Sequence, residues 1–307
     1  MNIQKTFFMI LRKASTFLAE KGFFNILPDE VYLKMRYKLC IGKKLDLDNP
    51  RTFNEKLQWL KINNRKNDYV TMVDKVLAKE FVGNIIGEKY IIPTIGCWNR
   101  AEEIDFDKLP NQFVLKCNHD SGGIVICKDK SLFNKQKAIK KLNKALKRTP
   151  YFVTREWPYK NVQRKILAEP YIEDNITRDL RDYKFFAFNG EVKAMFIASE
   201  RQNKNISTKF DFFDSDFNFL PIINGHPNSE IKPKKPCKFD EMKEMAEKLS
   251  IGLPHIRIDF YEANGNVYFG ELTFFHYGGM VPFEPQEWDE VFGAWIDLSL
   301  LSGGENC

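Results

Sequence analysis

Histidine and cysteine are scarce in this sequence. Among 307 residues there are 4 histidines and 6 cysteines, and no two cysteines form a C-x-x-C pair. A zinc site needs several such ligands at short, regular spacings. We therefore expect no zinc site, and we expect reduced thiols, as in a cytoplasmic protein.

Long apolar runs are also missing. None approaches the roughly 20 residues that a membrane-spanning helix needs. The apolar run at residues 7–11 ends at Arg12 and Lys13, and no small-residue cleavage site follows it. We expect neither a membrane span nor a signal peptide.

Neither sign of charge dominates the chain. Lys+Arg total 47 and Asp+Glu total 41, which leaves a net charge of +6. This mild excess fits an anionic ligand such as a nucleotide. The strongest basic cluster lies in the segment 131–148, and its basic residues, from Lys135 to Arg148, have no aromatic side chains between them, so we expect no nucleic-acid partner.

The composition that remains is typical of a globular protein with an aromatic core. Hydrophobic residues make up 43% of the chain, and 27 residues are phenylalanine. At roughly 150 residues per domain, the length suggests about two domains. A capping-box pattern at Thr52 and Glu55 predicts a helix start, and Asn189-Gly190 predicts a hairpin turn.

Helical and strand-like segments are interspersed along the chain. The predicted elements are helices at about 68–82, 131–148 and 239–250, and hairpins at 182–199 and 255–273. This mixture predicts an α+β fold. The first 50 residues include an amphipathic helix, which either packs on the main body or lies on an anionic membrane surface.

A small-residue loop at 118–123 lies between two predicted strands. No G-K-[ST] follows its glycines and no helix begins there, so it is not a Walker A loop. Backbone N–H groups of such a loop can still bind phosphates, and Lys116 at the strand end adds a positive charge. A tight hairpin without a ligand is the alternative.

A second candidate is the hairpin at 255–273, in which Arg257 and Asp259 share one face of a strand. If residues 264–266 form a three-residue loop, Asp259 faces Glu271 and Arg257 faces Thr273. A two-residue loop would instead put the two carboxylates on opposite faces.

Two facing carboxylates about 4 Å apart repel by about 4 kcal/mol at an effective dielectric constant of about 20. A divalent cation would relieve this repulsion, and Mg²⁺ favours such oxygen ligands. The alternative is an ordinary cross-strand pair with Arg257 as its counter-ion. A third candidate is Glu169 at the end of a short strand, where a backbone edge beside a carboxylate can bind adenine; a solvated glutamate is the alternative.

The order of several motifs resembles one known family. The motifs are Thr52-Phe53-Asn54-Glu55-Lys56-Leu57-Gln58-Trp59-Leu60, Val73-Asp74-Lys75, Val114-Leu115-Lys116-Cys117-Asn118-His119, Ala168-Glu169-Pro170-Tyr171, Asp182-Tyr183-Lys184-Phe185, Arg257-Ile258-Asp259 and Gly270-Glu271-Leu272-Thr273-Phe274. From about residue 50 to 296 the chain resembles the TupA-like (teichuronopeptide biosynthesis) ATP-grasp family. The resemblance implies two α+β lobes that hold ATP between them.

The resemblance also implies a division of the chain and a set of roles. It divides the chain into an N-terminal helical extension (1–50), an ATP-grasp N-terminal subdomain (51–110), a lid lobe (111–172) and a C-terminal catalytic lobe (173–307). The implied ATP-binding residues are Lys75, Lys116 and Lys184 at the phosphates, His119, Ser121, Gly122 and Gly123 in a mobile loop over them, and Glu169, Tyr171 and Ile172 at the adenine and ribose. The implied catalytic residues are Arg257 and Lys184, and the implied Mg²⁺ ligands are Asp259, Glu271 and Thr273.

The activity that the resemblance implies is ATP-dependent ligation of a carboxylate to an amine through an acyl phosphate. The implied substrates are a small-molecule or lipid-linked sugar carboxylate, such as a uronic acid of a bacterial surface polysaccharide, and an amino acid or small amine. Two alternatives stay open: a sugar-processing transferase or kinase, and a non-catalytic module at the inner membrane surface.

Two positions depart from the common ATP-grasp pattern. Thr273 stands where many relatives carry Asn, and His276 stands where a Pro- and Gly-containing turn is expected. His276 is either a base toward the amine or a structural histidine.

Overall fold

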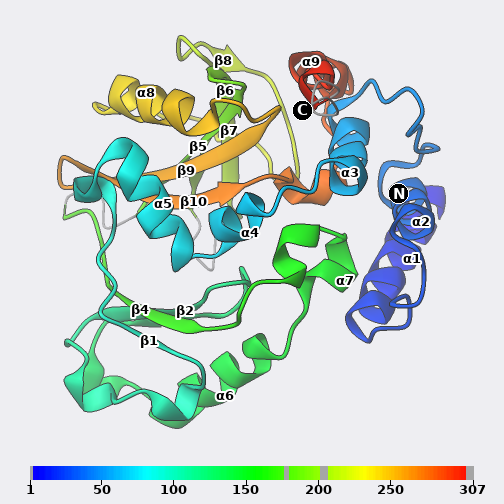
Figure 1. The fold of residues 1–307 in the computed structure, drawn as a ribbon. Helices are drawn as coiled ribbons and strands as arrows, with labels where there is room; N and C mark the ends of the chain where they lie inside the picture. Colours follow the sequence, from blue (N-terminus) through cyan, green and yellow to red (C-terminus); the bar gives the residue numbers. More distant parts are fainter. Residues whose placement is uncertain (1–2, 176–179, 201–206, 302–307) are drawn as a thin grey trace, which may run out of the picture.

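The chain folds around two antiparallel sheets. The computed structural model describes residues 3–175, 180–200 and 207–301. Within them, a six-stranded sheet has the order β10-β9-β5-β6-β7-β8, and a four-stranded sheet has the order β1-β4-β2-β3. Figure 1 shows the larger sheet with its helices in the upper half and the smaller sheet above α6 in the lower half. The expected α+β composition is confirmed.

The six-stranded sheet forms the main core together with two flanking helices. Its elements are β5 (Asp182–Phe188), β6 (Glu191–Ser199), β7 (Lys209–Asp214), β8 (Phe219–Leu220), β9 (Ile256–Ala263), β10 (Asn266–Thr273), α8 (Phe239–Ser250) and α9 (Glu287–Trp295). The predicted helix at 239–250 is therefore confirmed. Asn189 and Gly190 both have positive φ, as the predicted two-residue turn requires.

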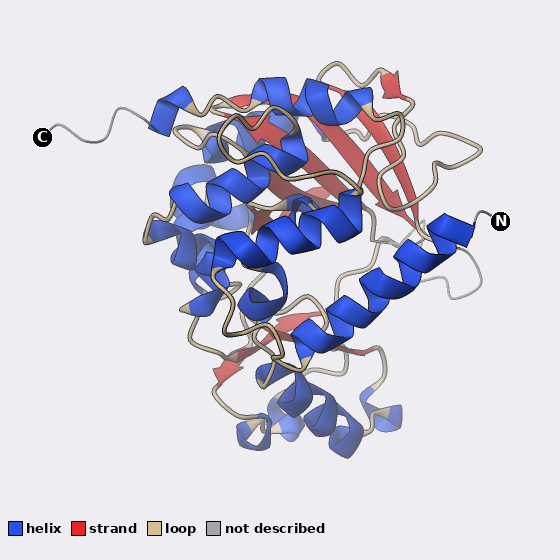
Figure 2. Cartoon of the chain, turned by 90° about the vertical axis from the view of Figure 1, so that its right-hand side faces the viewer, coloured by secondary structure: helices blue, strands red, loops and turns tan. Residues whose placement is uncertain are grey.

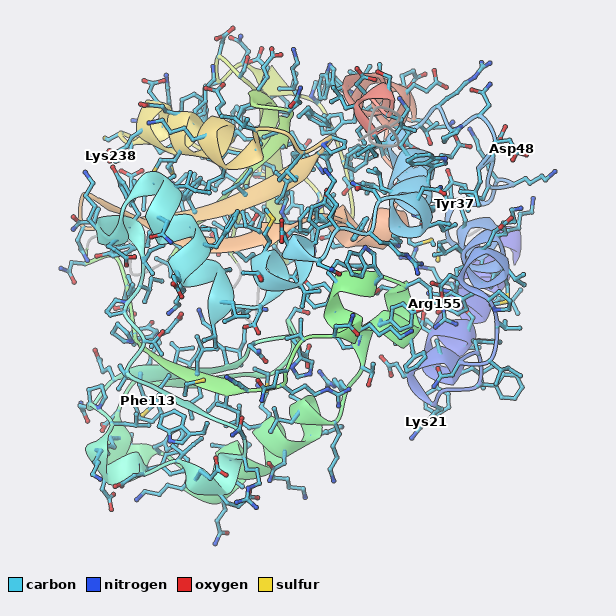
Figure 3. All side chains as sticks on the ribbon, in the orientation of Figure 1. Lys21, Tyr37, Asp48, Phe113, Arg155 and Lys238 are labelled. Carbon is cyan, nitrogen blue, oxygen red and sulfur yellow. The ribbon has the colours of Figure 1, made fainter. Side chains whose placement is uncertain are left out.

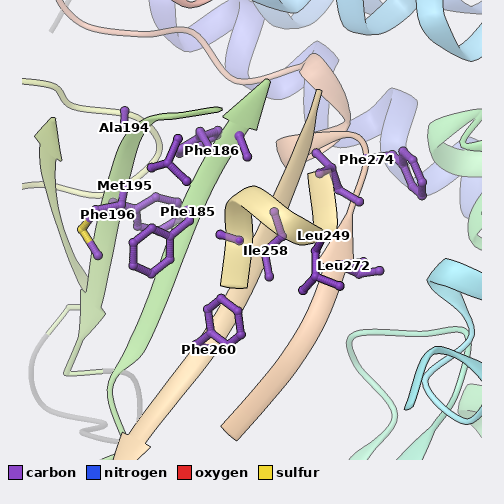
Figure 4. Packing of buried hydrophobic residues seen from close by; sticks show 14 of the residues in the cluster. Phe185, Phe186, Ala194, Met195, Phe196, Leu249, Ile258, Phe260, Leu272 and Phe274 are labelled. Atoms are coloured by element: carbon purple, nitrogen blue, oxygen red, sulfur yellow. The ribbon is translucent and has the colours of Figure 1, made fainter. Parts of the chain in front are cut away.

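Strand β5 is buried on both faces, which explains its run of phenylalanines. Phe185 packs against Phe239 of α8, with ring centroids 5.8 Å apart. The next residue, Phe186, points to the other face and packs against Phe292 of α9 at 5.2 Å. Figure 4 shows Phe185 and Phe186 of β5 near Ile258 and Phe260 of β9. The sheet is thus the middle layer of three.

The β9–β10 hairpin combines a two-residue turn with a bulge. Ala263 pairs with Asn266, so the loop has two residues, which is the second of the two lengths that the sequence left open. A bulge at Gly270 then shifts the register by one residue. Beyond it, Asp259 pairs with Glu271 and Arg257 pairs with Thr273, as predicted for these four residues.

The four-stranded sheet has its own core. Its strands are β1 (Gly96–Trp98), β2 (Phe113–Cys117), β3 (Ile124–Cys127) and β4 (Ile166–Pro170), and α6 (Lys135–Leu146) covers one face. The predicted basic helix at 131–148 is shorter than expected because the side chain of Asn134 caps it, accepting from the backbone N–H of Lys137. The division of the chain at residues 110 and 172 stays a prediction.

The last three α-helices before the first strand are α3 (Phe53–Asn63), α4 (Asp68–Val73) and α5 (Leu77–Ile86). The predicted capping box at Thr52 and Glu55 is present. The predicted continuous helix at 68–82 is wrong, because Asp74 is extended and its carboxylate accepts from the backbone N–H of Val76 at 2.8 Å. The break places Lys75 between two helices.

The N-terminal segment contributes α1 (Ile3–Glu20) and α2 (Asp29–Ile41), which lie beside α7 (Pro150–Thr154). Figure 2 shows α1 as the long helix near the N label. Arg155 after α7 pairs with Asp29 at 3.2 Å, and Figure 3 labels Arg155 where α7 meets these helices. In the described part of the chain, α1 therefore packs on the body. No described helix combines the length and apolarity needed to cross a membrane.

Candidate active site

A narrow cavity of about 20 Å³ lies between helices α4 and α5 and the two sheets. Its charged lining consists of Lys75, Lys79, Lys116, Glu169 and Glu271. Its apolar lining includes Met72, Ile92, Phe269 and Leu272. Cationic side chains beside apolar walls suit a ligand with a flat ring and anionic groups.

Glu169 is the centre of the charged lining. It is buried, and its two oxygens accept from Lys116 Nζ at 2.5 Å and from Lys79 Nζ at 2.7 Å. Burial raises the pKa of Glu169, but the two ammonium groups outweigh burial and lower that pKa below its usual value. Glu169 is therefore ionised at neutral pH. The solvated-glutamate alternative is wrong.

Lys79 is the site residue that sequence reasoning missed. It lies in the first turns of α5, and its Nζ also donates to the carbonyl oxygen of Ile92 at 2.7 Å. Burial lowers its pKa despite the attraction of Glu169. A signal was present, because Lys75 and Lys79 are four residues apart in the predicted helix and so fall on one face.

A second charged cluster lies on the face of β9 that carries Arg257 and Asp259. Asp259 is 1% exposed. Its oxygens accept from Arg257 Nε at 2.7 Å and Nη2 at 2.8 Å, and from Lys184 Nζ of the adjacent strand β5. Lys184 also lies 3.3 Å from Asp182. Burial lowers the pKa of Lys184 even though Asp259 favours its charged form.

Glu271 joins the two clusters. Its oxygens lie 3.2 Å from Arg257 Nη2 and 4.0 Å from Lys75 Nζ. Burial raises the pKa of Glu271, but Lys75, Lys184 and Arg257 outweigh burial and hold that pKa at about 2. Thr273 lies next to it and accepts from Arg257 Nη2 at 3.0 Å. Arg257 therefore bridges the Asp259, Glu271 and Thr273 side chains.

His276 supports Arg257 from the other side. Arg257 Nη1 donates to His276 Nδ1 at 2.7 Å. Because a guanidinium has only donors, Nδ1 carries no proton, and Nε2–H donates to Asn224 Oδ1 at 2.9 Å. Burial, followed by the charge of Arg257, lowers the pKa of His276 well below its usual value. This arrangement is that of a structural histidine.

The glycine loop lies at the edge of the first cluster. His119 is buried, and its Nε2 contacts the carbonyl oxygen of Arg148 at 3.2 Å. Asp120 accepts from Gly122 N at 2.6 Å and pairs with Arg148 at 3.0 Å. Gly123 packs so closely on Cys117 that a Cβ would lie 2.8 Å from its side chain, and Ser121 is exposed.

The loop contacts the first cluster at Lys75. Lys75 Nζ donates to the carbonyl oxygen of Asp120 at 3.3 Å. Tyr171 and Ile172, the two residues after β4, lie outside the cavity lining. Tyr171 donates to Glu173 at 2.7 Å, and neither Tyr171 nor Ile172 belongs to the described lining of the cavity that holds Glu169.

The oxygen donors of the second cluster suit a hard cation. Asp259 and Glu271 are direct cross-strand partners. Both alternatives, a metal site and an ordinary cross-strand pair with Arg257 as its counter-ion, predict this pairing, so the pairing alone does not choose between them. Within residues 3–175, 180–200 and 207–301, no group of three His, Cys, Asp or Glu side chains could hold a metal alone. Two carboxylates fit Mg²⁺ that is also held by phosphate oxygens.

Comparison with protein families identifies the chain. A family model described as TupA-like ATPgrasp matches residues 55–297. The chain belongs to the TupA-like ATP-grasp family. This membership confirms the resemblance and the ATP-grasp fold.

Solved structures similar to this ATP-grasp protein include D-alanine–D-alanine ligase from Helicobacter pylori, with a TM-score of 0.43 and 15% identity over 83% of this chain and 69% of that chain. The same ligase from Bacillus anthracis complexed with ATP matches with a TM-score of 0.38 and 14% identity over 66% of this chain and 53% of that chain. The ATP-grasp ligase PsnB complexed with minimal precursor, Mg and ADP matches with a TM-score of 0.40 and 12% identity, over 72% of this chain and 57% of that chain. The chain thus spans about half the length of some of these proteins. The search of curated proteins found no match.

Proposed function

We propose that this protein is an ATP-dependent carboxylate–amine ligase that works through an acyl phosphate. The observation that carries the proposal is an arrangement of charged side chains in two connected parts. Glu169, its two lysines and Lys75 line one cavity, and ion pairs lead from Lys75 through Glu271 and Arg257 to Asp259. The Glu169 cluster suits a nucleotide, and the cluster of Arg257 and Asp259 suits a reacting phosphoryl group.

The first cluster is the proposed ATP site. Apolar side chains such as Met72 and Leu272 would cover the adenine. Glu169 and the backbone of Tyr171 and Ile172 would hold the adenine and ribose, while Lys75, Lys116 and Lys184 would contact the phosphates. Residues 119–123 would close over the phosphates, and closure would exclude water that otherwise hydrolyses an acyl phosphate.

The second cluster is the proposed reaction centre. Asp259, Glu271 and Thr273 would hold Mg²⁺, which would neutralise the phosphate oxygens. The substrate carboxylate attacks the γ-phosphorus and ADP leaves; an amine then attacks the acyl carbon and phosphate leaves. Arg257 and Lys184 lie where negative charge accumulates in both steps, and fixed cations there lower the barrier.

The proposed substrates are a uronic acid carboxylate of a surface polysaccharide or its precursor and an amino acid or small amine. A lipid-linked precursor would bring the protein to the inner membrane surface. Exposed apolar side chains of the N-terminal segment support such peripheral association, since Phe17 is 58%, Phe23 69% and Ile26 90% exposed.

The test is ADP release in the presence of ATP, Mg²⁺, a panel of uronic acids and a panel of amines. The proposal expects release that needs both a carboxylate and an amine and that Asp259→Asn and Glu271→Gln each abolish. Lys43→Met, which removes an exposed charge far from the site in sequence, is the control. Full Mg²⁺-dependent release by either carboxamide variant contradicts the proposal.

The alternatives give different products. Phosphorylated sugar without an added amine would indicate a kinase. Vesicle co-sedimentation that is lost at high salt, without nucleotide binding, would indicate a non-catalytic surface module. Thermal unfolding with ADP, with and without Mg²⁺, separates the last case, because ligand at about 100 times Kd stabilises a protein by about 2.7 kcal/mol.

A further inference from the structure

A second and larger cavity, of about 240 Å³, lies between the N-terminal helices and the segment that follows β10. Its lining includes Arg12 and Thr16 of α1, Arg36 of α2, and Tyr277, Gly278 and Met280. This volume is far larger than one water molecule needs. The N-terminal segment and the catalytic lobe therefore enclose a space of the size of a small ligand.

Arg36 is a buried charge without a counter-charge. Arg36 is 7% exposed. Its guanidinium donates to the hydroxyl group of Ser15 and to that of Thr16, the latter at 3.0 Å. Among the described residues no carboxylate pairs with it. Burying a charge without an opposite charge costs free energy, which is why buried arginines are normally paired.

The neighbouring Arg155 shows the normal solution. It is 1% exposed and pairs with Asp29 at 3.2 Å. Near the N-terminal helices, Arg155 is thus paired with a carboxylate, whereas Arg36 contacts only hydroxyl groups. A guanidinium has five N–H donors, so the two hydroxyl contacts leave Arg36 able to bind an oxyanion. Arg12, on the same wall, adds a second positive charge.

The lining of the cavity includes the chain segment that directly follows His276. Phe269 to Leu272 of β10 line the first cavity, and His276 contacts Arg257. Tyr277 and Gly278 then line the second cavity. The lining of the second cavity thus begins one residue after His276, the hydrogen-bond partner of Arg257, and this closeness makes the cavity a candidate subsite for the substrate that accepts the phosphoryl group.

The Gly278 backbone that forms this wall is firmly held. Its carbonyl oxygen accepts from Gln58 Nε2 at 3.0 Å and from Lys61 Nζ at 2.7 Å, both from α3. Lys61 is fully buried. This part of the cavity lining is therefore fixed before a ligand binds.

We propose that this cavity binds a phosphate group of the carboxylate substrate, so that the substrate of this ligase is a phosphorylated sugar carboxylate rather than a free one. The inference rests on the proposed ligase function. Arg36 and Arg12 are the phosphate-binding residues, since arginine binds phosphate oxygens in a bidentate geometry. A sugar phosphate and a sugar diphosphate on a nucleotide or lipid carrier share this chemistry.

The experiment compares Arg12→Gln and Arg36→Gln with the matched control Arg51→Gln, which removes an exposed arginine outside the cavity. The KM for the acceptor is measured from ADP release with glucuronic acid, glucuronic acid 1-phosphate and UDP-glucuronic acid. We expect both cavity variants to raise the KM for the two phosphorylated acceptors by roughly tenfold or more, a loss of one charge-assisted contact. The KM for ATP and for glucuronic acid stays unchanged.

The affinities for the different phosphorylated acceptors show whether the sugar is carried by a nucleotide or by a lipid. A higher affinity for UDP-glucuronic acid than for the 1-phosphate supports a nucleotide carrier, and a higher affinity for the same sugar on a polyprenyl diphosphate in micelles supports a lipid carrier. Because Arg36 is buried and its loss can impair folding, the exposed Arg12 provides the decisive variant. Circular dichroism and the Tm check that each variant is folded.

The two proposals can fail separately. If ligation occurs and Arg12→Gln has the wild-type KM for both phosphorylated acceptors, the phosphate cavity is contradicted and the ligase function stands. If no carboxylate supports ADP release, thermal unfolding with glucuronic acid 1-phosphate still tests the cavity. Stabilisation of the wild type that Arg12→Gln abolishes supports the cavity, and no stabilisation overturns it.

Discussion

At the residue scale, Glu169 shows how a buried carboxylate can be kept charged. Its two oxygens face lysines from different parts of the chain, Lys79 of α5 and Lys116 of β2. Neither lysine alone would neutralise both oxygens. The pair therefore sets both the ionisation of Glu169 and the positions of two ammonium groups in the proposed ATP site.

Lys79→Met tests this arrangement. Removing one ammonium group leaves a Glu169 oxygen buried without its ion pair, and it disturbs the surface that would hold the nucleotide. We expect the Kd for ADP, measured by titration calorimetry, to rise roughly tenfold, as for loss of a charge-assisted hydrogen bond. Lys43→Met is the matched control, because Lys43 is exposed. An unchanged Kd in Lys79→Met would contradict the role of this lysine.

At the element scale, the bulge in β10 decides whether the proposed reaction centre exists. The two-residue turn at Asn264 and Gly265 would by itself put Asp259 and Glu271 on opposite faces of the hairpin. The bulge at Gly270 reverses this outcome. Glycine is favoured there, because a Cβ would lie 3.0 Å from the carbonyl oxygen of Asp259, a tight contact that β10 or β9 would have to relieve by shifting.

Gly270→Ala should therefore reduce activity more than stability. The added methyl group forces β10 away from Asp259, which we expect to cost about 1–3 kcal/mol in the free energy of unfolding. Displacing Glu271 from Asp259 is expected to slow Mg²⁺-dependent ADP release by about 10- to 100-fold.

Gly252→Ala is the control for Gly270→Ala. Gly252 has a φ of +75°, but a Cβ there meets nothing within 4 Å. It should lose stability because of its left-handed backbone while retaining ADP release per folded molecule. Equal activity in the two variants would show that the bulge does not control the proposed centre.

The crossing of α3 and α9 gives a second prediction at this scale. A Cβ on Gly293 of α9 would lie 2.2 Å from the carbonyl oxygen of Arg51 and 2.7 Å from Phe53 N. Because both neighbours are backbone atoms, Gly293→Ala should lower the free energy of unfolding by about 3 kcal/mol, at the upper end of overpacking effects. Ala294→Ser, at the adjacent exposed position, should have little effect in the same urea titration.

The sequence correctly predicted those elements that are stabilised by contacts between residues close together in the chain. The capping box at Thr52 and the Asn189-Gly190 turn act within four residues, and both are present. The break at Asp74 has a local and a distant contact, and the distant one has no signal in the nearby sequence: Asn118 Nδ2, 44 positions along the chain, donates to Asp74 Oδ2 at 2.9 Å, while the other oxygen accepts from Val76 N. The bulge at Gly270 was missed for the same reason, since it depends on packing against the neighbouring strand.

In the candidate site, too, the sequence predicted the residues that local patterns or family motifs mark, and it missed the contacts that come from distant parts of the chain. The strand period placed Arg257 and Asp259 on one face, and the structure agrees. The motifs of the family indicated Glu169, but the lysine that completes its ion pairs belongs to a helix from another part of the chain. The cavity beside Arg36 had no sequence signal, because it exists only where the N-terminal helices meet residues 277–281.

At the scale of the whole molecule, stability depends on a histidine that must stay neutral. His255 is buried against Phe53 and Phe188, with ring centroids 5.0 and 4.8 Å apart. Burial lowers its pKa from 6.5 to about 3, although its contact with the Ala187 carbonyl opposes this shift. Below pH 6.5 the unfolded chain therefore binds a proton that the folded chain does not, so stability falls as the pH falls.

His255→Gln removes this dependence while keeping a side-chain donor for the Ala187 carbonyl oxygen. Between pH 7.5 and 5.5 the wild type should lose about 1 kcal/mol more of its free energy of unfolding than the variant, since one pKa unit corresponds to about 1.4 kcal/mol. Urea titrations at the two pH values measure the difference. Parallel losses in both proteins would contradict a neutral His255.

The two sheets have separate apolar cores that share no residue. Polar contacts join the lobes at the proposed ATP site, among them Lys79–Glu169 and the bond from Lys75 N to the carbonyl oxygen of Asn118 at 3.2 Å. Because Glu169 already neutralises its lysines, an incoming polyphosphate would replace one counter-ion with another. Binding would then be an ion exchange, and added salt, which weakens both the old and the new pairs, would change the affinity less than the number of lysines suggests.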